Sequence, residues 1–235
     1  MNQQPMAWSA SRVKTFKSCP KKLYHMSIVP KGHPDKVLFK QGKAGARGED
    51  LHKVMEHRIL NKIALPSNFE YLEPLAKVID AAPGTALCEA QWALDTTFKP
   101  CGTKDWDRVY VRAVPDLLKV KDYAAVILDY KTGKPEFDEY QLKLNAGVGF
   151  IQLPDVTKIT TSYIYFKIGE LSKPVTYLRE NLTEIWRDLL VEPNKIEESR
   201  ATNYWPPKPG RHCSWCDVNA ARKCEFASEP YREFK

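Results

Sequence analysis

Two aspartates and a lysine are the residues whose spacing points most directly to chemistry. Asp129 and Lys131 stand two residues apart in an apolar segment, so on a strand their side chains would share a face. Asp116 follows a proline in the preceding apolar segment. If the two segments form a hairpin that turns at residues 122–123, Asp116 lies directly opposite Asp129, with Cβ atoms about 4.5–5.5 Å apart.

Two carboxylates at that separation repel each other unless a cation lies between them. Their oxygen atoms suit Mg²⁺ or Mn²⁺. Such an ion activates a water molecule, and a neighbouring ammonium group such as Lys131 stabilises negative charge on a phosphate. The alternative is a solvated sheet face on which Lys131 is a surface partner. The Val, Leu and Ile residues around both aspartates favour a buried, metal-bound arrangement.

His52 is a third kind of candidate ligand, on a segment with helical spacing. Glu49, His52 and Glu56 lie three and four residues apart, which places them along one edge of a helix. A lone histidine in such a place is more often an ordinary surface or core residue. We therefore weigh His52 only together with the other motifs.

A second metal site is indicated near the end of the sequence. Of the six cysteines, three gather there: Cys213, Cys216 and Cys224. In a protein of a reducing compartment, a Cys-x2-Cys pair with a third cysteine nearby is typical of metal ligation. The alternative is that they are buried thiols. His212 could serve as a further ligand, but it directly precedes Cys213, which strains the geometry.

These residues need elements to position them, and apolar periodicity predicts both helices and strands. Helices are expected over residues 9–18, 46–63, 70–81, 137–152 and 182–199. Strands are expected over residues 86–94, 109–120, 123–131, 158–168 and 174–179. We expect a single domain over 1–235, with a core at about 44–180 and an appendage from 9–25 and 200–228.

The composition favours an anionic partner. The net charge is +7 and the pI is about 9.0, which assists binding to polyanions such as DNA. Basic residues could line a channel for a single strand, with Trp205 or Trp215 as a stacking face; a solvated basic surface is the alternative. No secretion signal or membrane span is apparent. We expect a cytoplasmic protein of a bacterial or phage-infected cell.

Taken in order along the chain, these motifs resemble the RecB-like, CRISPR-adaptation-type branch of the PD-(D/E)XK nuclease superfamily. The segments that carry the resemblance are Ser9–Arg12, Cys19-Pro20, Gly48–His52, Pro115-Asp116, Asp129–Gly133, Tyr140-Gln141 and Cys213–Cys216. One departure is Ala113, where relatives usually have glycine. The resemblance implies an α/β fold with a restriction-endonuclease-like core, in which helices flank a mixed central sheet.

The resemblance also implies roles for single residues. The expected ligands of Mg²⁺ or Mn²⁺ are His52, Asp116, Asp129 and the backbone carbonyl of Tyr130. The expected catalytic residues are Lys131, Asp116, Asp129, Gln141 and, with less support, Glu89. Cys19 would join the three later cysteines around a 4Fe-4S cluster, with Zn²⁺ as the alternative.

The implied function is a metal-dependent deoxyribonuclease, most simply an exonuclease on single-stranded DNA or DNA ends. Two alternatives remain open at this stage. One is a structure-specific endonuclease, and the other is a non-catalytic DNA-binding or assembly protein that retains the fold. Replication or recombination proteins are possible partners.

Overall fold

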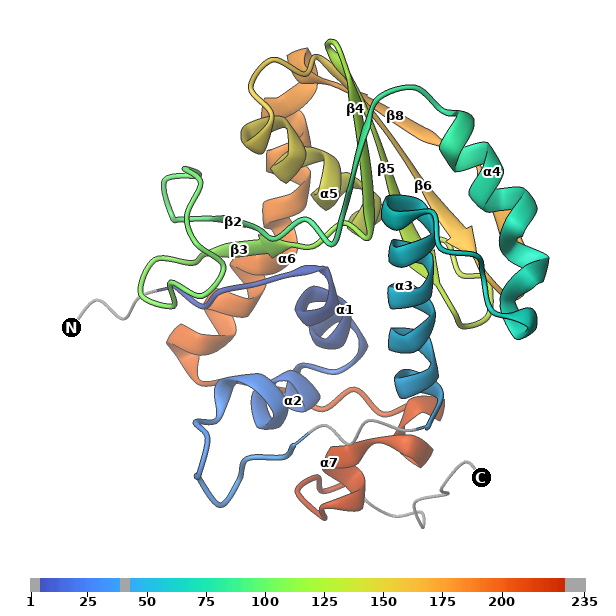
Figure 1. Cartoon of the computed structure of the whole chain (residues 1–235). Helices are drawn as coiled ribbons and strands as arrows, with labels where there is room; N and C mark the ends of the chain where they lie inside the picture. Colours follow the sequence, from blue (N-terminus) through green and yellow to red (C-terminus); the bar gives the residue numbers. More distant parts are fainter. Residues whose placement is uncertain (1–4, 39–42, 227–235) are drawn as a thin grey trace. The chain divides into compact units, whose positions relative to one another are not determined.

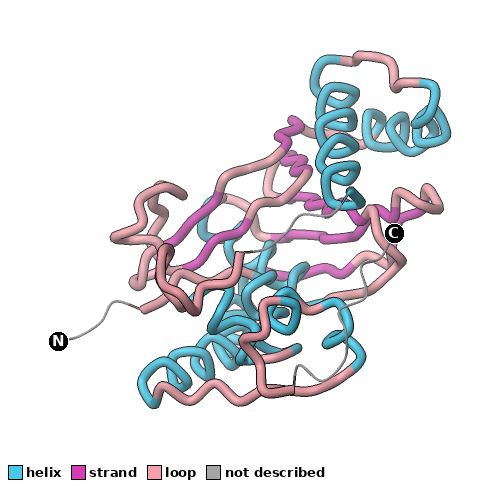
Figure 2. Tube along the Cα trace, turned by 90° about the horizontal axis from the view of Figure 1, so that it is seen from below, coloured by secondary structure: helices cyan, strands magenta, loops and turns pink. Residues whose placement is uncertain are grey.

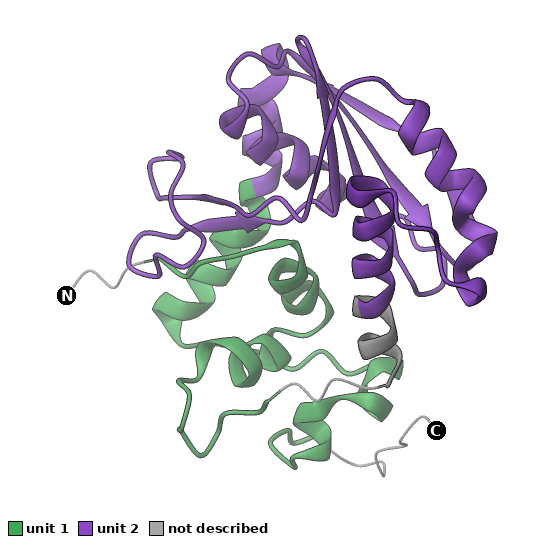
Figure 3. Ribbon diagram, viewed as in Figure 1, with its two compact units in different colours: residues 1–42, 190–235 green, residues 43–189 purple. Residues whose placement is uncertain are grey.

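The computed structural model describes residues 5–38 and 43–226, without the side chains of residues 43–49. The chain forms two compact units (Figure 3). Unit 1 draws on residues 1–42 and 190–235, and unit 2 is the continuous segment 43–189. No helix of the described part is long and apolar enough to cross a membrane.

Unit 2 is built on a mixed sheet, whose strands are magenta in Figure 2. Its strands are β1 (Thr85–Cys88), β4 (Leu117–Lys121), β5 (Ala124–Lys131), β6 (Lys158–Tyr165), β7 (Glu170–Leu171) and β8 (Val175–Leu178). They are ordered β1-β4-β5-β6-β7, and β8 also pairs with β6. Only β5 and β6 are parallel within this sheet. This is the mixed α/β arrangement that the sequence predicted.

Helix α5 (Glu139–Gln152) joins the parallel strands β5 and β6, a connection that parallel neighbours require. The helix begins where the Asp138 carboxylate accepts a hydrogen bond from the Tyr140 N–H, at 3.2 Å. It packs tightly on the sheet, because a Cβ atom at Gly149 would lie 3.0 Å from Cδ1 of Ile159. The glycine therefore sets how closely α5 approaches this face.

Two helices cover part of the opposite face of the sheet (Figure 1). They are α3 (Lys43–Asn61) and α4 (Glu73–Ala81), which is preceded by a 3₁₀ turn, Ser67–Leu72. The expected helix at 70–81 therefore starts as a tighter turn. Buried side chains join the two helices to the sheet: Leu51, Met55, Leu75, Ile79, Leu117, Leu128 and Tyr130. Unit 2 thus has a layer of helix on each side of the sheet.

The hairpin of β4 and β5 has the predicted register. Leu117 pairs with Leu128 and Lys121 with Ala124, so the loop contains only residues 122–123. Asp122 adopts a positive φ of 51°, a conformation that short turns between antiparallel strands use. If this register is continued by one residue beyond the pair of Leu117 and Leu128, Asp116 lies opposite Asp129.

Two of the expected strands are interrupted, which corrects the sequence analysis. The strand expected at 86–94 splits into β1 and β2 (Trp92–Leu94), and that expected at 109–120 splits into β3 (Val111–Ala113) and β4. β2 and β3 pair in a separate two-stranded sheet. Apolar alternation continues across both breaks, so it gives no sign of them.

The breaks occur opposite each other and are hydrogen-bonded together. The Glu89 N–H donates to the Asp116 carbonyl at 3.0 Å, and the Ala90 N–H donates to the Pro115 carbonyl at 3.2 Å. Glu89 has a positive φ of 50°, and Pro115 has no N–H to donate. Both segments therefore bend at the same level, next to two carboxylates.

Unit 1 contains short helices from both ends of the chain. They are α1 (Ala10–Ser18), α2 (Pro20–Leu23), a π-helical turn (Tyr24–Ile28), a 3₁₀ turn (Arg211–Trp215) and α7 (Asp217–Ala220). Helix α6 (Leu182–Thr202) runs from unit 2 into unit 1. The break between α1 and α2 falls at Cys19, as Pro20 predicted, because the residue before proline disfavours helical angles.

Candidate active site

Three potential ligands converge from three separate segments of unit 2. His52 comes from α3, Glu89 follows β1 and Asp116 precedes β4. His52 Nδ1 lies 3.1 Å from Asp116 Oδ1 and 3.6 Å from Glu89 Oε1. Among the described residues, this is the group of three acidic, histidine or cysteine side chains whose ligand atoms all lie within 4.8 Å of one another.

The backbone fixes the Asp116 carboxylate in place. Its second oxygen, Oδ2, accepts a hydrogen bond from the Tyr130 N–H at 2.5 Å. The Tyr130 ring packs edge-on against His52, with ring centroids 5.4 Å apart. Tyr130 was expected to supply its carbonyl, and its N–H and its ring also contact the group.

A second cluster joins the end of β5 to α5. Lys131 Nζ lies 2.8 Å from Asp129 Oδ2 and donates a hydrogen bond of 2.8 Å to Gln141 Oε1. Gln141 Nε2 donates to the other oxygen of Asp129. Asp129 and Lys131 therefore share a face, as predicted, and Gln141 connects them.

The two clusters are electrostatically linked. Burial, and after it the charge of Asp116, raises the pKa of Asp129 to about 6, although Lys131 acts in the opposite direction. Burial and then Asp116 also raise the pKa of Glu89. Burial by itself would lower the pKa of His52, but the hydrogen bond and charge of Asp116 outweigh it and the pKa is raised. Crowded carboxylates of this kind are relieved by a bound cation.

The donor set fits a divalent metal ion. Carboxylate oxygens and one imidazole are ligands that Mg²⁺ or Mn²⁺ accepts. The sequence of the chain agrees with this reading: the family model described as the PD-(D/E)XK nuclease superfamily matches residues 7–221. The chain belongs to the PD-(D/E)XK nuclease superfamily. Membership supports a metal-dependent nuclease with DNA as its substrate.

One solved structure supports the fold of this superfamily member. It is named "Putative exonuclease" from Eubacterium rectale; it has 10% sequence identity and a TM-score of 0.51, and the match covers 95% of this chain and 90% of that chain. Another, SSO0001, has 13% identity over 94% of this chain and 87% of that chain, with a TM-score of 0.37. No curated protein matches the chain significantly.

Sequence reasoning missed one residue beside the cluster of Asp129, Lys131 and Gln141, namely Tyr163. It lies on β6 beside Asp129 in the parallel register, and its side chain is fully buried. Lys131 Nζ lies 4.7 Å from the centre of its ring, a distance typical of a cation–π contact. The Tyr163 hydroxyl donates to the Asp138 carbonyl at 2.6 Å. In the sequence, Tyr163 is only an aromatic residue in a strand of alternating polarity. A residue of the hydrophobic core gives the same pattern.

The cysteines that the sequence grouped together line one pocket of unit 1. Cys19, Cys213, Cys216 and Cys224 all contribute to its wall, with His212 beside them. The Lys208 N–H donates to Cys19 Sγ and the Gly210 N–H to Cys213 Sγ, both at 3.4 Å. Nε2 of His212 is buried without a hydrogen-bond partner in the part of the chain that the structure describes. No disulfide joins these four sulfurs.

Proposed function

We propose that this chain is a divalent-metal-dependent deoxyribonuclease that hydrolyses phosphodiester bonds. One observation carries the proposal: a group of His52, Glu89 and Asp116 that could hold a metal lies beside a partly buried cluster of Asp129, Lys131 and Gln141. Ligands for a cation and a fixed positive charge are what metal-assisted phosphodiester hydrolysis uses. Membership of a nuclease superfamily supports the same reading.

We propose His52, Asp116, Asp129 and the Tyr130 carbonyl as ligands of Mg²⁺ or Mn²⁺. Glu89 stands 3.6 Å from His52 and orients it, or adds a ligand of its own. When bound, the ion supplies a water of lowered pKa and draws charge from the phosphate oxygens. The position of Asp116, set by the Tyr130 N–H, keeps one of its oxygens toward His52.

Lys131 would stabilise negative charge on the phosphate and orient the attacking water. Its ammonium group bonds to Asp129 and Gln141. These two partners hold it at the end of β5 instead of letting it extend into solvent. Gln141 would therefore act as the residue that positions Lys131 or contacts the DNA.

We propose that the enzyme is an exonuclease acting on single-stranded DNA or DNA ends. The exonuclease name of the similar Eubacterium rectale structure and the net charge of +7 support this choice. The competing proposal is a structure-specific endonuclease. A non-catalytic binding protein would be expected to have lost Asp129 or Lys131, and both are present.

The test compares linear and circular single-stranded DNA with Mn²⁺ or Mg²⁺. An exonuclease degrades the linear, end-labelled strand and leaves the circle intact, whereas an endonuclease cuts both. Lys131→Ala should remove the activity, and Lys104→Ala, which changes an exposed lysine of the β2–β3 loop, should retain it. Equal cleavage by wild type and Lys131→Ala would refute the proposed site.

We further propose that the chain is of the RecB-like, CRISPR-adaptation type and that its four cysteines bind a 4Fe-4S cluster. Outside the His52 group, no three potential ligands of the described residues lie within 4.8 Å of one another. Four thiolates at 2.3 Å from a single Zn²⁺ ion would lie only about 3.8 Å apart. The wider spacing favours a larger group, and N–H donors to two of the sulfurs suit a cluster.

Anaerobic purification distinguishes the two metals. An iron–sulfur protein absorbs broadly near about 400 nm and contains iron and acid-labile sulfide, whereas a zinc protein contains zinc and lacks this band. His212→Ala is the informative variant. Unchanged iron content in that variant supports four cysteine ligands, and loss of bound metal would make the imidazole a ligand.

The biological setting follows from these proposals. Both units would act as one nuclease domain, in the cytoplasm of a bacterial or phage-infected cell. Replication or recombination proteins are the partners we propose for such an enzyme.

A further inference from the structure

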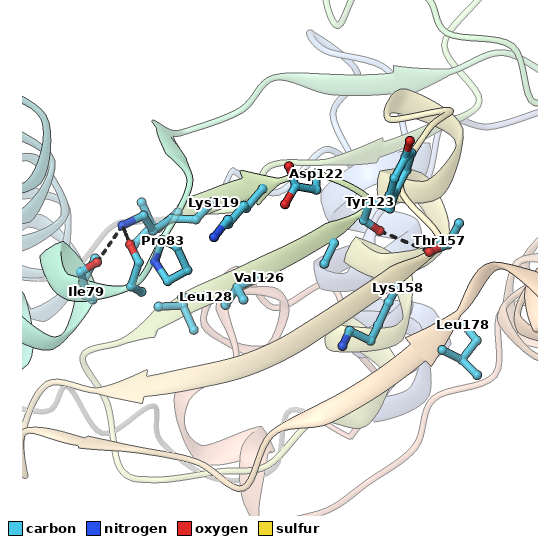
Figure 4. Close-up of a pocket in the computed structure, with 14 residues that line it drawn as sticks. Ile79, Pro83, Lys119, Asp122, Tyr123, Val126, Leu128, Thr157, Lys158 and Leu178 are labelled. Atoms are coloured by element: carbon cyan, nitrogen blue, oxygen red, sulfur yellow. Dashed lines mark hydrogen bonds between the residues drawn. The ribbon is translucent and has the colours of Figure 1, made fainter.

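Unit 2 has a groove that the proposed active site does not use (Figure 4). Its volume is about 660 Å³. It is lined by residues of β4, β5, β6 and β8, by Ile79 of α4 and by the segment that follows α4. Along β5, Val126 and Leu128 face the groove. Because side chains alternate along a strand, Ile127 and Asp129 point to the other face of the sheet.

The floor of the groove is aliphatic, and two of its side chains are exposed to solvent. Leu117, Val126, Leu128 and Leu178 form it, with Ile79 at its edge. Val126 is 40% exposed and Leu178 is 39% exposed, although both lie on strands of the central sheet. Leu117 and Leu128 are buried beneath them, so the exposed apolar part of the floor consists of Val126 and Leu178, which a bound molecule could cover.

Lysines border this floor, and they are of two kinds. Lys119 is buried and donates to the carbonyls of Ile79, at 2.8 Å, and Ala82, so it completes the end of α4. Lys121 and Lys158 are exposed. They stand in one row across the sheet, because Ala124 pairs with Lys121 on one side and with Lys158 on the other.

The two exposed lysines have no counter-charge within the described chain. No ion pair among the described residues includes either of them. Asp122 is the one acidic residue in the lining. The groove therefore presents two free positive charges next to an aliphatic floor.

We propose that this groove binds an acidic peptide segment of a partner protein, one that alternates carboxylates with apolar side chains. Carboxylates would meet Lys121 and Lys158 while apolar side chains cover Val126 and Leu178. A nucleic acid strand would use the lysines but leave the aliphatic floor in water. The groove and the side chain of Asp129 lie on opposite faces of the sheet. This binding does not depend on the proposed nuclease activity.

Fluorescence anisotropy with the full chain tests the proposal. The probe is a labelled peptide that repeats Asp-Asp-Leu-Phe; its controls replace every Asp by Lys or every Leu and Phe by Ser. We expect wild type to bind only the first peptide, with affinity that falls as salt rises. The double variant K121E/K158E should bind about tenfold more weakly. The matched variant K104E/K173E changes two exposed lysines outside the groove and should bind as wild type does.

Val126→Asp provides a second, independent reading, because it alters the floor and leaves both lysines. This substitution should also weaken binding of the acidic peptide. A thermal melt checks that each variant folds. Each of the following results would overturn the proposal: no binding of the acidic peptide by wild type, equal binding by K121E/K158E, or binding of a labelled single-stranded oligonucleotide that only the groove variants lose. Self-association that the groove variants abolish would likewise assign the groove to a second copy of the chain.

Discussion

The N–H of Tyr130 donates a 2.5 Å hydrogen bond to Oδ2 of Asp116. Tyr130 lies near the end of β5, and Asp116 immediately precedes β4. The last backbone pair of the two strands is Leu117 with Leu128. The bond therefore continues the contact between the two segments beyond that pair. It also leaves Oδ1 of Asp116 directed to His52, 3.1 Å from Nδ1.

Neutralising Asp116 or Glu89 should weaken metal binding. Asp116→Asn and Glu89→Gln each remove one carboxylate from the group around His52. We expect Mn²⁺ affinity to fall by about 10–100-fold in each, as for residues that bind or orient a metal ligand. Isothermal titration measures it. Glu70→Gln, an exposed position outside the group, is the control, and an affinity unchanged in Asp116→Asn would place the metal elsewhere.

Asp129→Asn should stabilise the metal-free protein at high pH. The pKa of Asp129 rises from 3.8 to about 6 on folding, so its charged form is disfavoured in the folded state. The penalty is absent below about pH 4 and fully present above about pH 6, where it amounts to about 3 kcal/mol. Urea unfolding in EDTA should show the variant more stable at pH 8 and equal to wild type near pH 3.5. A lower stability at pH 8 would mean that the Lys131 contact dominates.

Tyr163 should affect turnover more than substrate binding. Tyr163→Leu removes the ring that faces Lys131 Nζ at 4.7 Å, whereas Tyr163→Phe keeps the ring and loses only the bond to the Asp138 carbonyl. We expect kcat to fall about 3–30-fold in the leucine variant, with little change in KM, and to be largely retained with phenylalanine. Equal losses in both variants would assign the effect to the hydroxyl.

Cys19→Ser should abolish the metal binding that we propose for the cysteines of unit 1. The residue lies between α1 and α2, and its sulfur accepts a hydrogen bond from the Lys208 N–H. We expect loss of bound metal and a lower Tm, since the site closes a very long loop of chain. Cys88→Ser changes a buried cysteine of unit 2 and should keep the metal. Mass spectrometry compares the metal content of the two variants with that of wild type.

Gly84→Ala should destabilise unit 2. Gly84 has a φ of +108°, and a Cβ atom there would lie 2.4 Å from the Val120 carbonyl oxygen. We expect the free energy of unfolding to fall by about 1–3 kcal/mol, from backbone strain and the clash. Gly133→Ala meets nothing within 4 Å and should change it little. Urea denaturation compares the two.

The β4–β5 hairpin was predictable because a two-residue turn fixes every pair that follows it. Asp116, Asp129 and Lys131 could therefore be grouped from the sequence. The breaks at Glu89 and Asp116 were not predictable, because apolar alternation continues through them and the bend depends on hydrogen bonds between segments far apart in the chain. Tyr163 was not predicted for a related reason. Helix α5 connects β5 to β6, and residue spacing alone does not give the pairing register of two strands that a helix connects.

Unit 2 is one uninterrupted stretch, whereas unit 1 is assembled from residues on both sides of it. On the ribosome, the whole of unit 2 emerges before residue 190 and has the chance to fold first. Cys19 is synthesised early, but it must wait for Cys224 before the pocket of thiols is complete. Insertion of any inorganic group that these cysteines hold is therefore one of the last events in the maturation of the protein.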